Sequence, residues 1–215
     1  VSFSGAGVAG VGASATVNTL ANEVKSEITG NTTVIGLGNS GVEYDGSTRY
    51  GVVVAADASS TIDMVTANGA VGGVAGVAAL FSFNLVDDSA RVVVGEAGEG
   101  NLVRINPDAT GLATALGSET AAQAQDTELL ASTDADVTVI AANVAIGGKA
   151  GVGVGSGNVL ATSLAEGAVG EAIVEARDDV TLDSTAVTDL ETVTLGLAGG
   201  FVGVGRNGLL CACRR

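Results

Sequence analysis

Acidic side chains are the groups in this sequence best suited to chemistry. Carboxylate pairs serve as acid and base in glycoside hydrolysis, and carboxylate clusters bind Ca²⁺ through six to eight oxygens. Successive residues on a strand point to opposite faces, so only residues two apart can share one face. We interpret these acids mainly as solvated surface, with structural Ca²⁺ and catalysis as alternatives. The candidates are Asp87–Asp88, Asp178–Asp179, Glu43 with Asp45, and Asp134 with Asp136, the pair that can share a face.

A glycine-rich motif near the start of the chain has the spacing of a dinucleotide-binding loop. Residues 5–10 (GAGVAG) fit G-x-G-x-x-G, and Glu23 or Glu27 stands near the position of a ribose-binding acid. The same type of motif recurs three more times along the chain, where no nucleotide-binding unit is plausible. A structural role for these glycines is therefore favoured, and no cofactor is predicted.

Several residue types that catalysis commonly uses are missing or scarce. The chain has no His, which excludes Ser-His-Asp and Cys-His nucleophile systems and imidazole metal sites. Cys211 and Cys213 are the only cysteines; they are too few for a metal site, and a disulfide between them would be strained. Tyr44 and Tyr50 flank a turn signal at Asp45-Gly46, and are expected to cap a hairpin or loop rather than bind ligand. We therefore predict a protein that is not an enzyme, with no catalytic, cofactor-binding or metal-binding residues.

Charge and hydropathy limit the partners of this chain. Its 215 residues include 24 acidic and 9 basic ones, a net charge of −15 that repels nucleic acid. The uncharged run from Met64 to Val86 has about the length of a membrane-spanning helix. Its many glycines, its polar residues and the absence of flanking Lys, Arg, Trp or Tyr argue against that assignment. We predict no membrane insertion of this segment.

An internal repeat is the strongest pattern in the sequence. Three copies of G-G-x-x-G-V begin at Gly72, Gly147 and Gly199, and a fourth with one substitution begins at Ala6. The copies start 66, 75 and 52 residues apart, and each full copy follows a segment of alternating apolar and polar residues, as in residues 136–140. Such alternation predicts strands. An Asn follows the motif's Val in the copies that begin at Ala6, Gly72 and Gly147. Asn18 and Asn84 come seven residues after the Val, and Asn158 comes six residues after it.

Many short strands of Val, Ala and Gly with a single Pro favour a coil that stacks turn upon turn. We predict an all-β parallel β-solenoid over residues 1–215, a single segment and a fragment of a longer chain. Blocks of this size would each supply about three turns of roughly 20 residues, giving on the order of ten turns and a rod about 50 Å long. Residues 112–130, which are rich in Ala, Gln, Glu and Leu, are expected to leave the solenoid as a helix or a long loop.

The order of strand, glycine motif and Asn-containing strand resembles the repeat of large bacterial β-helical surface proteins. These are autotransporter passengers and filamentous, leukotoxin-like or haemagglutinin-like adhesins, and the resemblance is least over residues 96–133 and after Gly205. It implies a right-handed β-helix, secretion to the cell surface, and a structural or adhesive role without catalysis. We expect self-association end to end or with neighbouring repeats of the same chain, and a host-surface or glycan ligand. The alternative is a β-helical polysaccharide-active enzyme or a phage tailspike-like protein.

Overall fold

The computed structural model describes residues 1–37, 41–95, 102–109, 111 and 125–214, with side chains described as far as Arg206. Nearly all of these residues lie in β-strands, as the alternating pattern predicts. The strands are β1 (Ser2–Ala6), β2 (Ala9–Ile28), β3 (Thr33–Val34), β4 (Val42–Tyr44), β5 (Ser47–Arg49), β6 (Gly51–Gly72), β7 (Ala75–Val94), β8 (Val103–Ile105), β9 (Asp126–Gly147), β10 (Ala150–Val169), β11 (Ala172–Val174), β12 (Val180–Gly199) and β13 (Val202–Arg214).

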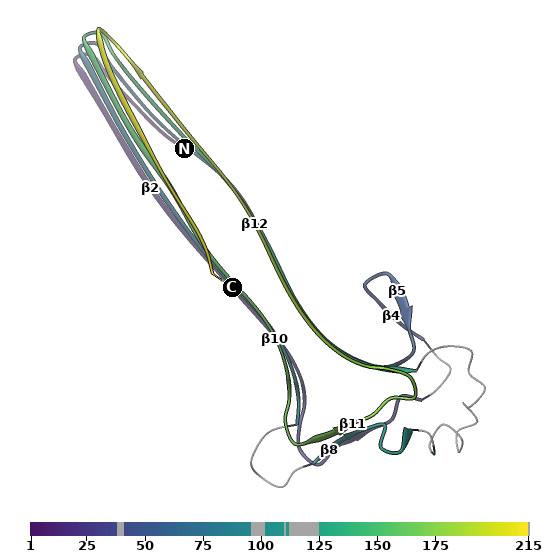
Figure 1. Ribbon diagram of the computed structural model, residues 1–215. Coiled ribbons are helices and arrows are strands. Elements are labelled where there is room, and N and C mark those ends of the chain that lie inside the picture. The colour runs from purple at the N-terminus through teal and green to yellow at the C-terminus, as the bar shows by residue number, and fades with distance from the viewer. Residues whose placement is uncertain (38–40, 96–101, 110, 112–124, 215) are drawn as a thin grey trace.

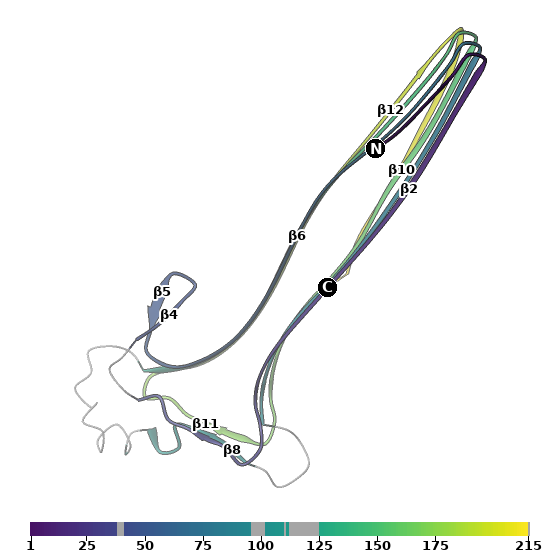
Figure 2. The same cartoon turned by 180° about the vertical axis from the view of Figure 1, so that it is seen from behind.

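The chain winds through two long parallel sheets in successive coils. Sheet A has the order β1-β6-β9-β12, and sheet B has the order β2-β7-β10-β13. Each strand of sheet A passes through a two-residue turn into the next strand of sheet B. A short sheet C, with the order β3-β8-β11, connects the other ends of the long strands. The long sheets form a flat blade with the turns at its tip and sheet C at its base (Figures 1 and 2).

The coils are fewer and much wider than the sequence analysis predicts. Each long sheet has four strands in the described part of the chain, so the expectation of roughly ten turns of about 20 residues is wrong. Paired residues are separated by 66 positions for Ser2 and Asn68, and by 75 for Gly51 and Asp126. Single strands of 20 to 22 residues span the blade without interruption. At about 3.3 Å per residue they are about 70 Å long, while four stacked strands, at about 4.8 Å each, occupy only about 19 Å.

The expectation that residues 112–130 leave the solenoid is wrong for residues 126–130. β9 begins at Asp126, so residues 126–130 form a strand rather than a helix or loop, and residues 112–124 lie outside the described residues. Asp126 pairs with Gly51 of β6, and Thr127 pairs with both Val52 and Val180. Pairing with strands on both sides outweighs the local preference of this segment for helix.

The core side chains become smaller from the base to the tip. The base holds a cluster of Val, Leu and Ile that includes Val92, Ile105 and Leu129. The middle of the blade is packed with smaller residues such as Val137 and Ala161, and the apolar cluster nearest the tip consists of three alanines, Ala70, Ala78 and Ala145. The sheets accordingly approach each other toward the tip and separate toward the base (Figure 1). The abundance of small residues in the sequence therefore reflects this taper.

The last glycine of each repeat motif lies where the two sheets meet most closely. A Cβ atom on Gly76 would stand 2.3 Å from the carbonyl oxygen of Ile146 on the facing sheet. The corresponding glycines, Gly10 and Gly151, would place a Cβ 2.3 and 2.4 Å from backbone oxygens of sheet A. Real side chains do not approach a backbone oxygen this closely, so the closed tip requires glycine at these positions. The structural interpretation of the glycine motif agrees with this geometry.

Asparagine side chains in the interior form hydrogen bonds both between the two sheets and within sheet B. The Asn143 side-chain amide donates to the carbonyl oxygens of Ala78 at 3.0 Å and Val154 at 2.7 Å, both on sheet B. Asn18 and Asn84 are paired in register, and Asn18 Nδ2 donates to Asn84 Oδ1 at 3.0 Å. Asn158, which comes one residue earlier in its copy of the motif, pairs with Phe83 on the outer side of sheet B instead. The one-residue offset thus reverses its face, as strand alternation requires.

The uncharged run from Met64 to Val86 is not a helix. It comprises the end of β6, the turn at Gly73–Val74 and the first part of β7, and it forms the tip of one coil. None of the helical segments in the described ranges has the length and apolar character needed to span a bilayer.

Candidate functional site

A β-hairpin stands beside sheet A near the base of the blade. β4 and β5 pair antiparallel, with Tyr44 opposite Ser47, and Asp45 and Gly46 form the turn between them. Both turn residues have positive φ, 50° for Asp45 and 69° for Gly46, which is the backbone of a type I′ turn. An Asp-Gly pair adopts this conformation readily, so the predicted hairpin at Tyr44 is confirmed.

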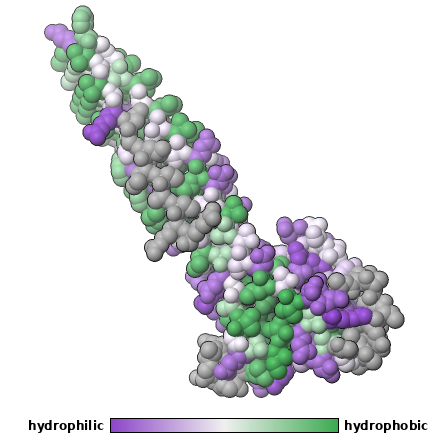
Figure 3. Space-filling model, in the orientation of Figure 1, coloured by the Kyte–Doolittle hydropathy of each residue, from purple (hydrophilic) through white to green (hydrophobic). Residues whose placement is uncertain are grey.

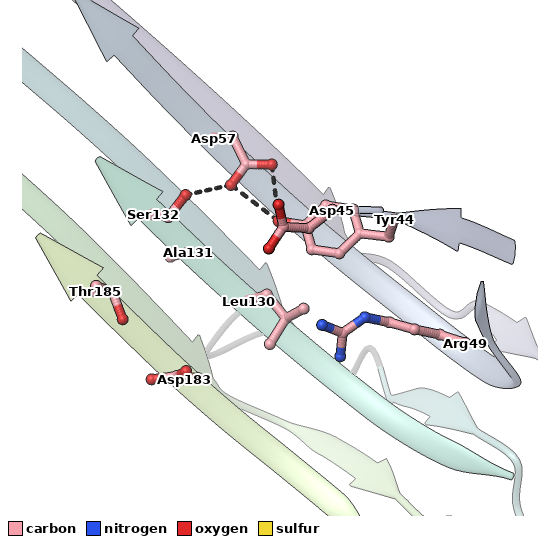
Figure 4. A pocket seen from close by; sticks show the side chains of 9 residues that line it. All are labelled: Tyr44, Asp45, Arg49, Asp57, Leu130, Ala131, Ser132, Asp183 and Thr185. Atoms are coloured by element: carbon pink, nitrogen blue, oxygen red, sulfur yellow. Dashed lines mark hydrogen bonds between the residues drawn. The ribbon is translucent and has the colours of Figure 1, made fainter. Parts of the chain in front are cut away.

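The hairpin and the outer face of sheet A enclose a cavity of about 430 Å³, which we call the hairpin pocket. Its floor is formed by paired residues on three neighbouring parallel strands. Asp57 on β6 pairs with Ser132 on β9, which pairs with Thr185 on β12. Figure 4 shows these side chains on the three strands, with Tyr44 and Arg49 reaching over them from the hairpin. The lining residues are Tyr44, Asp45, Arg49, Asp57, Leu130, Ala131, Ser132, Asp183 and Thr185.

The Asp57 carboxylate is the centre of the hydrogen bonding in the hairpin pocket. The Tyr44 hydroxyl donates to its two oxygens at 2.9 and 2.8 Å, and the Ser132 hydroxyl donates to Oδ1. Burial, followed by the hydrogen bond to Asp57 and the negative charges of Asp57 and Asp45, raises the pKa of Tyr44 to about 12. Tyr44 is therefore a neutral donor over the whole physiological range of pH.

Arg49 fastens the hairpin to the sheet. Its guanidinium lies 5.4 Å from the centroid of the Tyr44 ring, a cation–π arrangement, and forms an ion pair with the largely buried Glu128 of β9. Three further carboxylates line the hairpin pocket: Asp45, Asp57 and Asp183. Because Arg49 is the only cation in this lining and is paired with Glu128, the hairpin pocket has an excess of negative charge.

The hairpin pocket combines carboxylates, hydroxyls and an aromatic ring. Asp57 and Asp183 lie two strands and two residues apart on the floor of the pocket, a Cα separation of about 12 Å. The Asp57 carboxylate is also held in place by hydrogen bonds from the Tyr44 and Ser132 hydroxyls. The mixture of an aromatic ring, carboxylates and hydroxyls can accept and donate hydrogen bonds to a polar ligand.

The acids singled out in the sequence are distributed over several places. Asp87 and Asp88 point to opposite faces, as predicted; Asp88 is fully buried and accepts a hydrogen bond from Ser60 Oγ at 2.6 Å. Asp134 and Asp136 share the exposed outer face of sheet A, also as predicted. Asp136 lies directly beside a third acid, Asp189 of β12.

The remaining candidates lie near the base. Asp178 and Asp179 precede β12, where Asp178 Oδ2 accepts from the backbone of Gln125 at 2.9 Å. Glu43 and Asp45 belong to the hairpin, and only Asp45 lines the pocket. Within the ranges that the structure covers, no three acidic or cysteine side chains are grouped as metal ligands. Cys211 and Cys213 lie in β13, and their side chains are outside the described residues.

The sequence analysis missed most of the hairpin pocket. It identified Tyr44 and Asp45 but not Arg49, Asp57 or Ser132, because the pocket residues come from different coils. The offset between Asp57 and Ser132 is 75 residues, the same as the spacing of the second and third glycine motifs. Aligning the chain with itself on those motifs was therefore the signal that could have placed these two residues side by side.

Searches with this chain found no matching family model, curated protein or solved structure.

Proposed function

We propose that this chain is a structural and adhesive segment of a secreted or surface-displayed fibrous protein, wound as a right-handed β-helix. The observation that carries the proposal is the parallel, in-register stacking of corresponding repeat residues, such as Gly76 on Gly151 and Gly151 on Gly203. A fold that grows by adding equivalent coils makes a shaft or spacer. Parallel crossover connections are right-handed in about 98% of cases, which supports the proposed hand. The adhesive role rests on the resemblance to bacterial surface proteins.

The ends of the coil stack support self-association or continuation into neighbouring repeats. On β12, Val180 and Leu182 occupy inward positions, since Leu182 pairs with the buried Leu129, yet both are 51% exposed. Figure 3 shows apolar residues gathered at the base on this end of the stack. A further coil, from the same protein or from a second copy, would cover these side chains and pair with the free edge of β12.

Electron microscopy of concentrated protein tests end-to-end assembly. Leu182→Lys introduces a charge at an inward position of the terminal coil. Leu195→Lys is its matched control on the outer face of the same strand, because the two leucines have similar exposed fractions, 51% and 55%. We expect filaments for the unchanged protein and for Leu195→Lys, and only short particles for Leu182→Lys. Filaments of equal length in all three, or none in the unchanged protein, would contradict this assembly.

The hairpin pocket is the surface that we assign to a glycan or other host-surface ligand. Its carboxylates and hydroxyls suit the hydroxyl groups of a saccharide, and its volume of about 430 Å³ is in the range of small-molecule sites. Glycan-array binding by the unchanged protein, compared with an Arg49→Ala variant that releases the hairpin from Glu128, tests this assignment. Equal glycan binding by the two proteins would refute it.

A polysaccharide-active β-helical enzyme is the second candidate. The observation in its favour is the shared outer face of Asp134, Asp136 and Asp189. This alternative predicts that replacing Asp134 and Asp136 by Ala abolishes a measurable cleavage of polysaccharide. Our preferred proposal assigns no catalysis to these residues.

A further inference from the structure

On β2, β7 and β10, the outer face of sheet B is uncharged along the half of the blade nearest the tip. Three stretches of β2, β7 and β10 form this region: residues 9–20, 75–86 and 150–161, which pair in register. None of the three contains Asp, Glu, Lys or Arg. We call their outward-facing side chains the sheet-B tip face.

Large apolar side chains are exposed on the sheet-B tip face. Val11, Val17, Val77, Phe81, Val154 and Leu160 are each between 37% and 69% exposed. On these three strands the charged residues of the same outer face begin at Asp87, one row beyond the tip face, and continue with Arg91 and Glu166 toward the base. On the bordering strand β13, Arg206 lies beside Val154 at the edge of the tip face. A contiguous apolar region of this kind on a protein with a net charge of −15 marks an interaction surface rather than ordinary solvent-facing strand.

The area of the sheet-B tip face is large enough for a specific interface between two copies. Twelve residues along the strands and three strands across span about 40 Å by about 14 Å, or about 550 Å² on each copy. Two copies packed face to face would bury about 1,100 Å², above the roughly 1,000 Å² expected of a specific interface. β13, whose side chains are described as far as Arg206, borders this region.

The surface relief of the sheet-B tip face is self-complementary. A shallow apolar hollow lies at its centre, floored by small residues such as Ala13, Ala15 and Ala79. Phe81 stands at the edge of this hollow and is 46% exposed. In an isologous pair, the Phe81 ring of each copy can enter the hollow of the other, so one residue supplies both knobs.

Charge determines the relative direction of the two copies. If the blades lay parallel, Asp87 and Glu166 of one copy would stand over the same residues of the other. In the antiparallel arrangement the charged bases lie at opposite ends, separated by about the 40 Å length of the tip face and several Debye lengths at physiological salt. We propose that two copies of this chain pack through their sheet-B tip faces in antiparallel orientation. This lateral contact uses a different surface from end-to-end stacking and does not depend on it.

Analytical ultracentrifugation over a range of concentrations tests the proposal with two matched variants. Val17 lies on the sheet-B tip face and Val65 on the outer face of sheet A, and they are 66% and 65% exposed. Val17→Glu places a charge from each copy in the interface and should raise the dimer dissociation constant roughly a hundredfold or more, whereas Val65→Glu should leave it unchanged. Phe81→Ala, which removes the knob, should also weaken the dimer.

Two further measurements make the result decisive. Repeating the series with Leu182→Lys, which blocks the end of the coil stack, separates lateral dimers from end-to-end filaments. Flotation with neutral phosphatidylcholine vesicles tests a lipid surface as the alternative occupant of the tip face. A monomer at all concentrations, equal weakening by Val17→Glu and Val65→Glu, or vesicle binding lost with Val17→Glu in a protein that does not dimerise would each overturn the proposal.

Discussion

Replacing Gly76 by Ala should open the tip of the blade. The added Cβ would lie 2.3 Å from the carbonyl oxygen of Ile146, about 1.1 Å short of the 3.4 Å at which ordinary contact begins. The obstructing atom belongs to the backbone of β9, which is held by hydrogen bonds to strands on both sides and cannot move alone. The sheets must therefore separate, and overpacking of this kind costs about 1–3 kcal/mol.

Gly5→Ala is the matched control for this substitution. Gly5 is also a strand glycine near the tip, but a Cβ there meets no atom within 4 Å. Loss of unfolded-state entropy alone should make this variant about 0.4–1 kcal/mol more stable than the unchanged protein. The difference in free energy of unfolding between Gly76→Ala and Gly5→Ala should thus be about 1.4–4 kcal/mol, and Gly10→Ala and Gly151→Ala should resemble Gly76→Ala.

Urea denaturation followed by circular dichroism measures these differences, provided the slope with denaturant is the same in each variant. Amide hydrogen exchange locates the effect: in Gly76→Ala, protection should fall first at the tip, around Ile146 and Ala75. If Gly76→Ala proves as stable as Gly5→Ala, with unchanged tip protection, the sheets do not meet as closely as described and the role assigned to the repeat glycines is wrong.

Three other substitutions test the polar contacts. In a Tyr50→Phe background, tyrosinate absorbance should report a pKa near 12 for Tyr44. Asp57→Asn should lower this pKa but keep the part of its rise that burial causes, and an unchanged pKa would contradict the hydrogen bond. Because the folded pKa lies above the unfolded value of 10, this contact stabilises the fold fully below pH 10, and its contribution should disappear as the pH rises through 12 in a pH series of urea melts. Ser60→Ala removes the hydrogen bond from Ser60 to the fully buried Asp88 carboxylate and should lower the free energy of unfolding by about 1–3 kcal/mol, measured by denaturant. No change in this free energy would show that water replaces the hydroxyl. Asn143→Ala removes both hydrogen bonds from this side chain to sheet B and should lower stability by about 1–3 kcal/mol, with faster exchange on both sheets rather than on sheet A alone.

The hairpin shows how much of the candidate site a local pattern can predict. Asp45-Gly46 specifies a tight turn through its own backbone preferences, so the position of Tyr44 beside a hairpin was predictable. The contact between Tyr44 and Asp57 was not predictable, because nothing in the twelve residues between them indicates how the hairpin folds over sheet A. Ser132 is still further away in sequence and reaches Asp57 only through the pairing of β6 with β9.

Alternation, small side chains and repeated glycines were sufficient to predict strands that stack in parallel around a narrow interior. These are local properties: the period of two sets the faces of each strand, and the absence of a Cβ permits close approach wherever the backbones meet. The number and width of the coils were decided only by the tertiary structure. A strand such as β6 continues for 22 residues because its neighbours β9 and β1 offer partners along it, and no residue within the strand signals where that pairing will end.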